Sequence, residues 1–81
     1  MDEFHGKVAV ITGAASGMGR EFANLAGSLG MKLVLADVQP KALEKAADEL
    51  ARHSEVLAMV CDVRKGAHVQ ELADSAMARF G

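Results

Sequence analysis

The sequence contains neither tyrosine nor tryptophan, only one cysteine and one proline, and no long apolar run. A chain without tyrosine has no phenol that could act as an acid or a base. Cys61, the single cysteine, cannot close an internal disulfide, and a free thiol is typical of a reducing compartment such as the cytoplasm. No segment approaches the ~20 apolar residues of a membrane span, and residues 1–5 lack the regions of a signal peptide. We therefore expect a cytoplasmic protein.

The sequence also lacks a large excess of either basic or acidic residues. The 9 basic and 11 acidic residues are interspersed and give a net charge of −2. No basic block is longer than Arg64-Lys65, so the sequence lacks the electrostatic pattern of a protein that binds nucleic acid or a membrane surface. His5, His53 and His68 do not stand at metal-ligand spacing with one another or with Cys61. We expect no metal site and assign these histidines no special role.

Apolar segments with the length of strands alternate with segments of helical periodicity. The runs 7–12, 32–37 and 55–61 predict buried strands. Helices are predicted over 18–29, from Pro40 to about residue 51, and over 66–80. The predicted apolar faces of these helices consist of Met18, Phe22, Leu25, Ala26 and Leu29, then Leu43, Ala46, Ala47, Leu50 and Ala51, then Val69, Leu72, Ala73, Ala76, Met77 and Phe80.

The order β-α-β-α-β-α predicts a parallel sheet within an α/β fold. Right-handed crossovers give the strand order 3-2-1 and place the first two helices on one face. A doubly wound fold would continue to a fourth strand beside the first, and the 81 residues end before it. We thus expect one incomplete domain over residues 1–81. Because the first strand would have an unpaired edge, the isolated chain should be weakly stable, and should aggregate or pair with another chain.

A glycine-rich segment, residues 12–19, joins the first strand to the first helix, with the spacing Gly-x-x-x-Gly-x-Gly. A pyrophosphate requires backbone N–H donors and the positive end of a helix, which such a turn supplies. Gly13 would permit the tight turn, Gly17 the approach of the backbone to the phosphates, and Gly19 close packing of the helix. Ser16 could bond a cofactor or cap the helix, and both roles stay open.

Acidic residues follow the second and third strands. Asp37 lies 18 residues beyond Gly19, near the ~20 expected for a carboxylate that accepts from a ribose hydroxyl. That carboxylate would repel the 2′-phosphate of NADP, and neither chain neighbour of Asp37 is basic, so NAD is favoured over NADP. The alternative to a ribose-binding role is that Asp37 is simply a turn residue after the strand. Asp62 could accept from an adenine amino group, with Val63 against the ring, or could be a cap or turn residue before the next helix.

Together these motifs resemble the short-chain dehydrogenase/reductase family over essentially the whole chain. The resemblance implies a three-layer Rossmann-like half domain and an NAD(P)-dependent oxidoreductase acting on small-molecule alcohols and ketones, commonly as a homo-oligomer. By this resemblance Gly13, Ser16, Gly17, Met18 and Gly19 would line the pyrophosphate and ribose. Asp37 and Val38 would hold the adenosine ribose, and Cys61, Asp62 and Val63 the adenine.

The family's later motifs are missing. These are the Asn-Asn-Ala-Gly segment, the catalytic Ser and the Tyr-x-x-x-Lys pair, so the chain should supply no catalytic residue and should be a non-catalytic N-terminal fragment. One alternative is a stand-alone nucleotide-binding or association module. An S-adenosylmethionine-dependent methyltransferase ranks lower, because Thr12 stands where those enzymes usually carry an acid before the first glycine.

Overall fold

The computed structural model describes residues 3–81, in which three strands alternate with three helices. All six predicted segments are present, and their ends differ from the predicted ends by at most one residue. The prediction that residues 1–5 do not form a signal peptide falls partly on Met1 and Asp2, which lie outside the described residues. The strands are β1 (Val8–Thr12), β2 (Lys32–Asp37) and β3 (Val56–Val60), and the helices are α1 (Gly17–Ser28), α2 (Pro40–Leu50) and α3 (Gly66–Phe80).

The three strands form a parallel sheet in the order β1-β2-β3, which confirms the predicted topology. Val8 lies beside Lys32 in the first pair, and Asp37 lies beside Val60 in the second. In this register the carboxyl ends of all three strands meet at one edge of the sheet. Open α/β sheets bind ligands at that edge.

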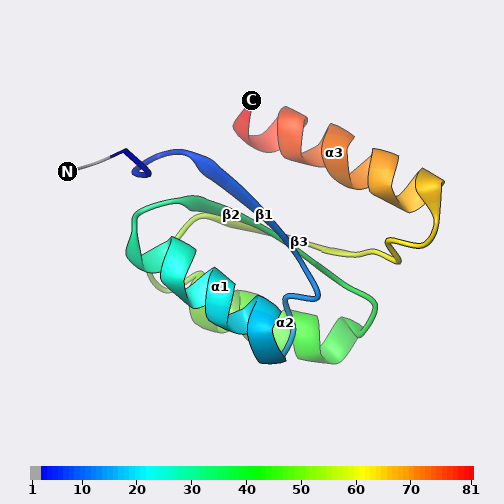
Figure 1. The fold of residues 1–81 in the computed structure, drawn as a ribbon, viewed down its shortest axis with the longest axis horizontal. Helices are drawn as coiled ribbons and strands as arrows, with labels where there is room; N and C mark the ends of the chain where they lie inside the picture. Colours follow the sequence, from blue (N-terminus) through cyan, green and yellow to red (C-terminus); the bar gives the residue numbers. More distant parts are fainter. Residues whose placement is uncertain (1–2) are drawn as a thin grey trace.

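Helices cover both faces of the sheet, giving the predicted three layers. Helices α1 and α2 lie on one face and α3 lies on the other (Figure 1). Successive side chains of a strand point to opposite faces. Accordingly, Leu33 and Leu35 of β2 enter the core beneath α1 and α2, whereas Val34 and Ala36 enter the core beneath α3. The central strand β2 is therefore apolar on both faces and joins the two cores.

Four of the five residues in the predicted apolar face of α1 are exposed and are not buried against the sheet. Ala23 and Ala26 are the buried side chains of this helix. They are small and allow α1 to approach the sheet closely, so the larger side chains turn away from it. Met18, Phe22, Leu25 and Leu29 are exposed.

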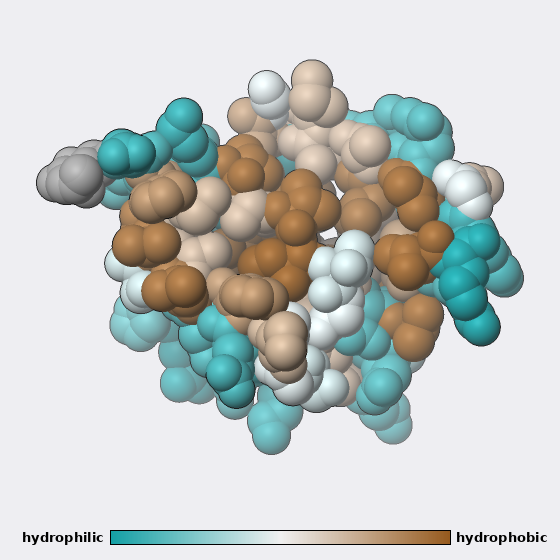
Figure 2. Space-filling model, in the orientation of Figure 1, coloured by the Kyte–Doolittle hydropathy of each residue, from teal (hydrophilic) through white to brown (hydrophobic). Residues whose placement is uncertain are grey.

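Strand β1 is also less buried than predicted. Its inner side chains, Ala9 and Ile11, pack against the core beneath α1, but Val8 and Val10 are exposed. The cause is that α3 packs chiefly on β2 and β3, so it leaves this face of β1 uncovered. Figure 2 shows hydrophobic surface between α1 and α3, where β1 lies in Figure 1. We call the exposed side chains of Val8, Val10, Met18, Phe22 and Leu25 the β1-edge patch.

No helix within residues 3–81 is long and apolar enough to cross a bilayer.

Candidate functional site

The loop between β1 and α1 places backbone at the head of the helix. Gly17 is the first helical residue and has a φ of 61°, a conformation that side chains rarely adopt. A Cβ on Gly19 would collide with the carbonyl oxygen of Gly13 and stand 2.7 Å from its carbonyl carbon. Gly19 therefore permits close packing, as predicted, and the surface it meets is the turn itself together with the end of β1.

Ser16 occupies the N-cap position of α1 in an extended conformation, with a φ of −158°. Its hydroxyl makes no capping hydrogen bond within the described part of the chain. The position predicted for a cap is thus correct, but the side chain does not perform that role here. A helix N-terminus carries unpaired N–H groups and a partial positive charge, so the backbone of this loop suits an anion.

Asp37 lies directly beside this loop. Its carboxylate accepts hydrogen bonds at 3.0 Å from the backbone N–H of Ala15 and at 3.0 Å from that of Gln39. The residue is 8% exposed, and it is the one buried polar residue within residues 3–81. A carboxylate offers about four acceptor positions, so two remain for hydroxyl donors. The predicted proximity of Asp37 to the glycine-rich turn is therefore correct.

Asp62 is held in a turn that follows β3. Its carboxylate accepts from the backbone N–H of Arg64 at 3.0 Å and from two guanidinium nitrogens at 3.0 and 2.9 Å. These hydrogen bonds hold the pKa of the Asp62 carboxyl well below its usual range, and the same pair raises the pKa of Arg64. The N-cap of α3 is Lys65, so of the two structural alternatives Asp62 is a turn residue and not the cap.

A hollow of about 390 Å³ opens at the carboxyl edge of the sheet. It brings together residues that the sequence spreads over three strand ends. Val38 and Val63 are half exposed at its rim, while Cys61 is buried. The residues that line this hollow are Thr12, Gly13, Asp37, Val38, Cys61, Asp62, Val63 and Arg64.

Four of the predicted residues do not line this hollow. Met18 and Gly19 line a separate, larger hollow of about 640 Å³ beside the same turn, together with Val10 and Phe22. Met18 is 72% exposed there. Eight of the ten predicted residues therefore line one or other of two adjoining hollows that share Thr12 and Gly13, whereas Ser16 and Gly17 line neither of them.

The structure adds two residues that the sequence did not single out for the site. Arg64 lines the hollow with Asp37, although it is remote from Asp37 in the chain. His68 accepts a hydrogen bond at its Nδ1 from the backbone N–H of Asp62, at 3.1 Å. The acid–base pair two residues apart could have signalled Arg64. No sequence pattern predicts the contact between His68 and the Asp62 N–H, because this contact depends on where the turn places the imidazole ring.

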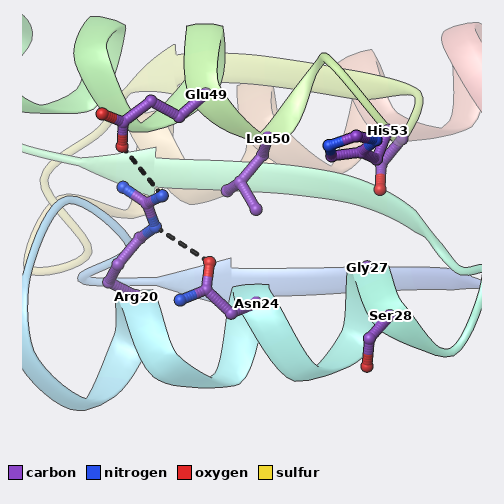
Figure 3. A pocket seen from close by; sticks show the side chains of 8 residues that line it. Arg20, Asn24, Gly27, Ser28, Glu49, Leu50 and His53 are labelled. Atoms are coloured by element: carbon purple, nitrogen blue, oxygen red, sulfur yellow. Dashed lines mark hydrogen bonds and ion pairs between the residues drawn. The ribbon is translucent and has the colours of Figure 1, made fainter.

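A third hollow, of about 380 Å³, lies between α1 and α2 (Figure 3). Arg20 bridges the helices there through an ion pair of 2.9 Å with Glu49, and its Nε donates to Asn24 at 3.1 Å. The side chain of Glu49 is 41% exposed, so this ion pair remains in contact with solvent. Because these charged groups already satisfy one another, the hollow is a weaker candidate than the strand-end site.

Metal ligands do not cluster in the described residues. Groups of three or more His, Cys, Asp or Glu side chains that could hold an ion are absent from residues 3–81. The strand-end hollow combines backbone groups, two carboxylates, the Arg64 guanidinium and apolar side chains.

Comparison with known proteins places this geometry in context. The chain is 42% identical over 78 residues to a 1,6-dihydroxycyclohexa-2,4-diene-1-carboxylate dehydrogenase of Pseudomonas putida, covering 96% of this chain and 29% of that protein. It superposes with a TM-score of 0.95 and 58% identity on a short chain dehydrogenase/reductase from Burkholderia phymatum in complex with NAD, covering 100% of this chain and 29% of that one. For NAD⁺-bound xylitol dehydrogenase the values are 0.92 and 34%, with 98% and 31% covered.

The chain thus spans about 29% of the length of the Pseudomonas putida dehydrogenase. The family model described as short chain dehydrogenase matches residues 7–81, which include every strand and helix described above. This chain belongs to the short-chain dehydrogenase family.

Proposed function

We propose that this chain forms the adenosine and pyrophosphate half of the cofactor site of an NAD-dependent oxidoreductase. One observation carries the proposal: the buried carboxylate of Asp37 and the backbone turn at the head of α1 lie in hydrogen-bond contact at the ligand-binding edge of the sheet. A dinucleotide offers a ribose to the first and a pyrophosphate to the second.

The residues present fit such a ligand. Gly13, Ser16, Gly17, Met18 and Gly19 would surround the pyrophosphate and the adjoining ribose, since the N-cap hydroxyl is not engaged in capping. Asp37 would accept from ribose hydroxyls through its two remaining acceptor positions, with Val38 beside the sugar. Cys61, Asp62 and Val63 would form the wall for adenine. Two ligand-sized hollows support the assignment: one is lined by Gly13, Met18 and Gly19, and the other by Gly13 and the predicted strand-end residues.

NAD would supply the hydride chemistry, acting on small alcohols or ketones. The chain's own contribution is binding, because it contains no tyrosine and no Tyr-x-x-x-Lys pair to exchange a proton with substrate. The 81 residues alone should therefore bind cofactor without turnover. The free thiol of Cys61 suits a reducing compartment such as the cytoplasm.

Calorimetric titration of the chain with NAD, NADP and ADP-ribose tests the proposal. NAD and ADP-ribose should bind with similar affinities, because both carry the adenosine and the pyrophosphate, and NADP should bind at least about tenfold more weakly. Asp37→Ala should weaken binding of NAD. Absence of heat for NAD and ADP-ribose, with the fold verified by circular dichroism, would disprove the proposal.

A second candidate function is an association module. The exposed β1-edge patch favours it, since large exposed apolar patches mark interaction sites. Oligomerisation without dinucleotide binding would favour this alternative. We do not retain the methyltransferase interpretation, because the family model and the similar proteins reported above are dehydrogenases.

A further inference from the structure

His68 belongs to the first turn of α3 and lies partly buried against the turn that follows β3. Its Nδ1 accepts the backbone N–H of Asp62 at 3.1 Å. An imidazole nitrogen accepts only when it carries no proton, so this contact requires an unprotonated Nδ1, with the ring proton on Nε2. The contact therefore specifies both the position and the tautomer of the ring.

The N–H that His68 binds lies where β3 leaves the sheet. The preceding N–H, of Cys61, still donates to the carbonyl of Asp37 at 2.9 Å and continues the ladder with β2. Successive N–H groups of a strand point to opposite sides. The N–H of Asp62 thus points away from β2, on the side where β3 has no neighbouring strand in residues 3–81. His68 supplies the acceptor that the sheet does not.

All the polar groups of Asp62 are engaged locally. Its carbonyl accepts from Lys65 N–H at 2.9 Å, and its carboxylate is bound by Arg64. Arg64 belongs to the same short turn and would move with it, and Lys65, the N-cap, joins the turn to α3 through backbone contacts alone. His68 is different, because it is anchored in α3, whose Leu72 is buried against the sheet. The ring therefore ties the turn to a packed helix.

We propose that His68 is a positioning residue that fixes the Asp62 peptide and so presets the adenine wall of the dinucleotide site. Holding a loop in its binding conformation raises affinity, because less ordering remains to be done on binding. The proposal rests on the proposed function, in that it takes Asp62 and Val63 as the residues that meet adenine. His68 itself does not touch the ligand.

Three substitutions at His68 distinguish the effect of losing the hydrogen-bond acceptor from the effect of losing side-chain volume. His68→Phe keeps a ring of similar size but removes the acceptor, and His68→Ala removes both. His68→Asn places an amide oxygen at the same position along the side chain as Nδ1 and restores the acceptor. We expect the first two to raise the Kd for NAD about three- to tenfold, the range of one lost hydrogen bond, and His68→Asn to stay within about twofold of the unsubstituted chain.

A second ligand reports on the contact itself. Nicotinamide hypoxanthine dinucleotide lacks the amino group that Asp62 would accept from. The unsubstituted chain should prefer NAD to this analogue, and His68→Phe should lose most of that preference while His68→Asn keeps it. A merely structural role would weaken both ligands equally, which would overturn the proposal.

Nuclear magnetic resonance supplies a readout without ligand. The His68 ring should show an unprotonated Nδ1, and the Asp62 amide should exchange slowly in the unsubstituted chain and in His68→Asn, but rapidly in His68→Phe and His68→Ala. If the unsubstituted chain binds no NAD yet shows these signals, the proposed function fails while the contact stands. If it binds NAD and His68→Phe, correctly folded, binds equally well, the positioning role is wrong.

Discussion

The carboxylate of Asp37 and the backbone N–H of Ala15 are joined by a hydrogen bond of 3.0 Å that ties the end of β2 to the glycine-rich turn. The two residues are 22 positions apart in the chain. Because the other carboxylate oxygen accepts from Gln39 at the start of the next connection, Asp37 links two loops at once. The residue proposed to hold a ribose therefore also shapes the loop proposed to hold phosphate.

Asp37→Ala should consequently cost stability as well as affinity. Two buried or partly buried N–H groups would lose their acceptor, at about 1–3 kcal/mol each at most. We expect a lower urea midpoint, and a loss of NAD affinity of tenfold or more. Asp37→Asn retains one acceptor oxygen, so its urea midpoint and its NAD affinity should lie between those of the unsubstituted chain and those of Asp37→Ala. Unchanged NAD binding by Asp37→Ala would refute the ribose role.

Gly19→Ala should disrupt the turn, since the added Cβ meets the backbone of Gly13 and not a flexible side chain. Overpacking of this kind costs about 1–3 kcal/mol, occasionally more. Gly66→Ala is the matched control, because a Cβ at this helical position meets nothing within 4 Å. Thermal unfolding should show a large loss for the first variant and little change for the second. Equal effects would contradict this explanation of the glycine.

Arg64 makes the preference between NAD and NADP a sharper test than the sequence suggested. Asp37 should repel a 2′-phosphate, but Arg64 lines the same hollow and could attract one if released from Asp62. We expect its pairing to persist, so that Arg64→Ala leaves the weak affinity for NADP unchanged in titration. Tight NADP binding that disappears in Arg64→Ala would show that this guanidinium is a phosphate ligand.

The Asp62–Arg64 pair should also respond to pH in a defined direction. The carboxyl pKa is depressed in the folded state, so its contribution to stability is complete above the unfolded value of about 3.9 and is lost only as pH falls towards the lower folded value. The carboxyl carbon resonance of Asp62 should therefore stay flat through pH 4. In Arg64→Ala the side-chain bonds disappear, and the titration should move towards the usual value. A normal midpoint in the unsubstituted chain would contradict the pairing.

The β1-edge patch should make the isolated chain associate. Exposed strand edges and apolar patches promote pairing between chains. Sedimentation should show concentration-dependent association, reduced by Phe22→Gln. Phe22 is 56% exposed, so this substitution should leave the fold intact by circular dichroism. A monomer at all concentrations, with sharp and reversible unfolding, would disprove the prediction.

The sequence predicted the elements and the topology well because both depend on local patterns. Strand β2 was found without error because every residue from Leu33 to Ala36 is apolar and buried on both faces. The helix α2 face was largely correct for the same reason, since Leu43, Ala46 and Leu50 are buried at the predicted spacing.

Burial in α1, β1, β3 and α3 could not be predicted from hydrophobic spacing: Val60 of β3 and Val69 and Met77 of α3 are exposed, although they belong to the predicted buried strand and apolar face. Met18, Phe22 and Leu25 follow a helical stripe, but small residues allow the closest packing and Ala23 and Ala26 took the sheet side. In the candidate site, the strand-end carboxylates were predictable from their positions. Two contacts were not predictable, because the bond from the Ala15 N–H to the Asp37 carboxylate and the bond from the Asp62 backbone N–H to His68 depend on the path of two loops.

The contact between Asp37 and Ala15 has a consequence for redesign. Exchanging this acid for a neutral residue is an obvious way to admit a phosphorylated ribose, yet here it would also release the N–H of Ala15. If the chain binds NAD as proposed, a redesign towards NADP must therefore provide a new acceptor for that N–H, from the same side chain or from a second substitution. A redesign should therefore vary position 37 together with a second residue, because a neutral residue at position 37 alone could change which dinucleotide is accepted but would leave the N–H of Ala15 without its acceptor.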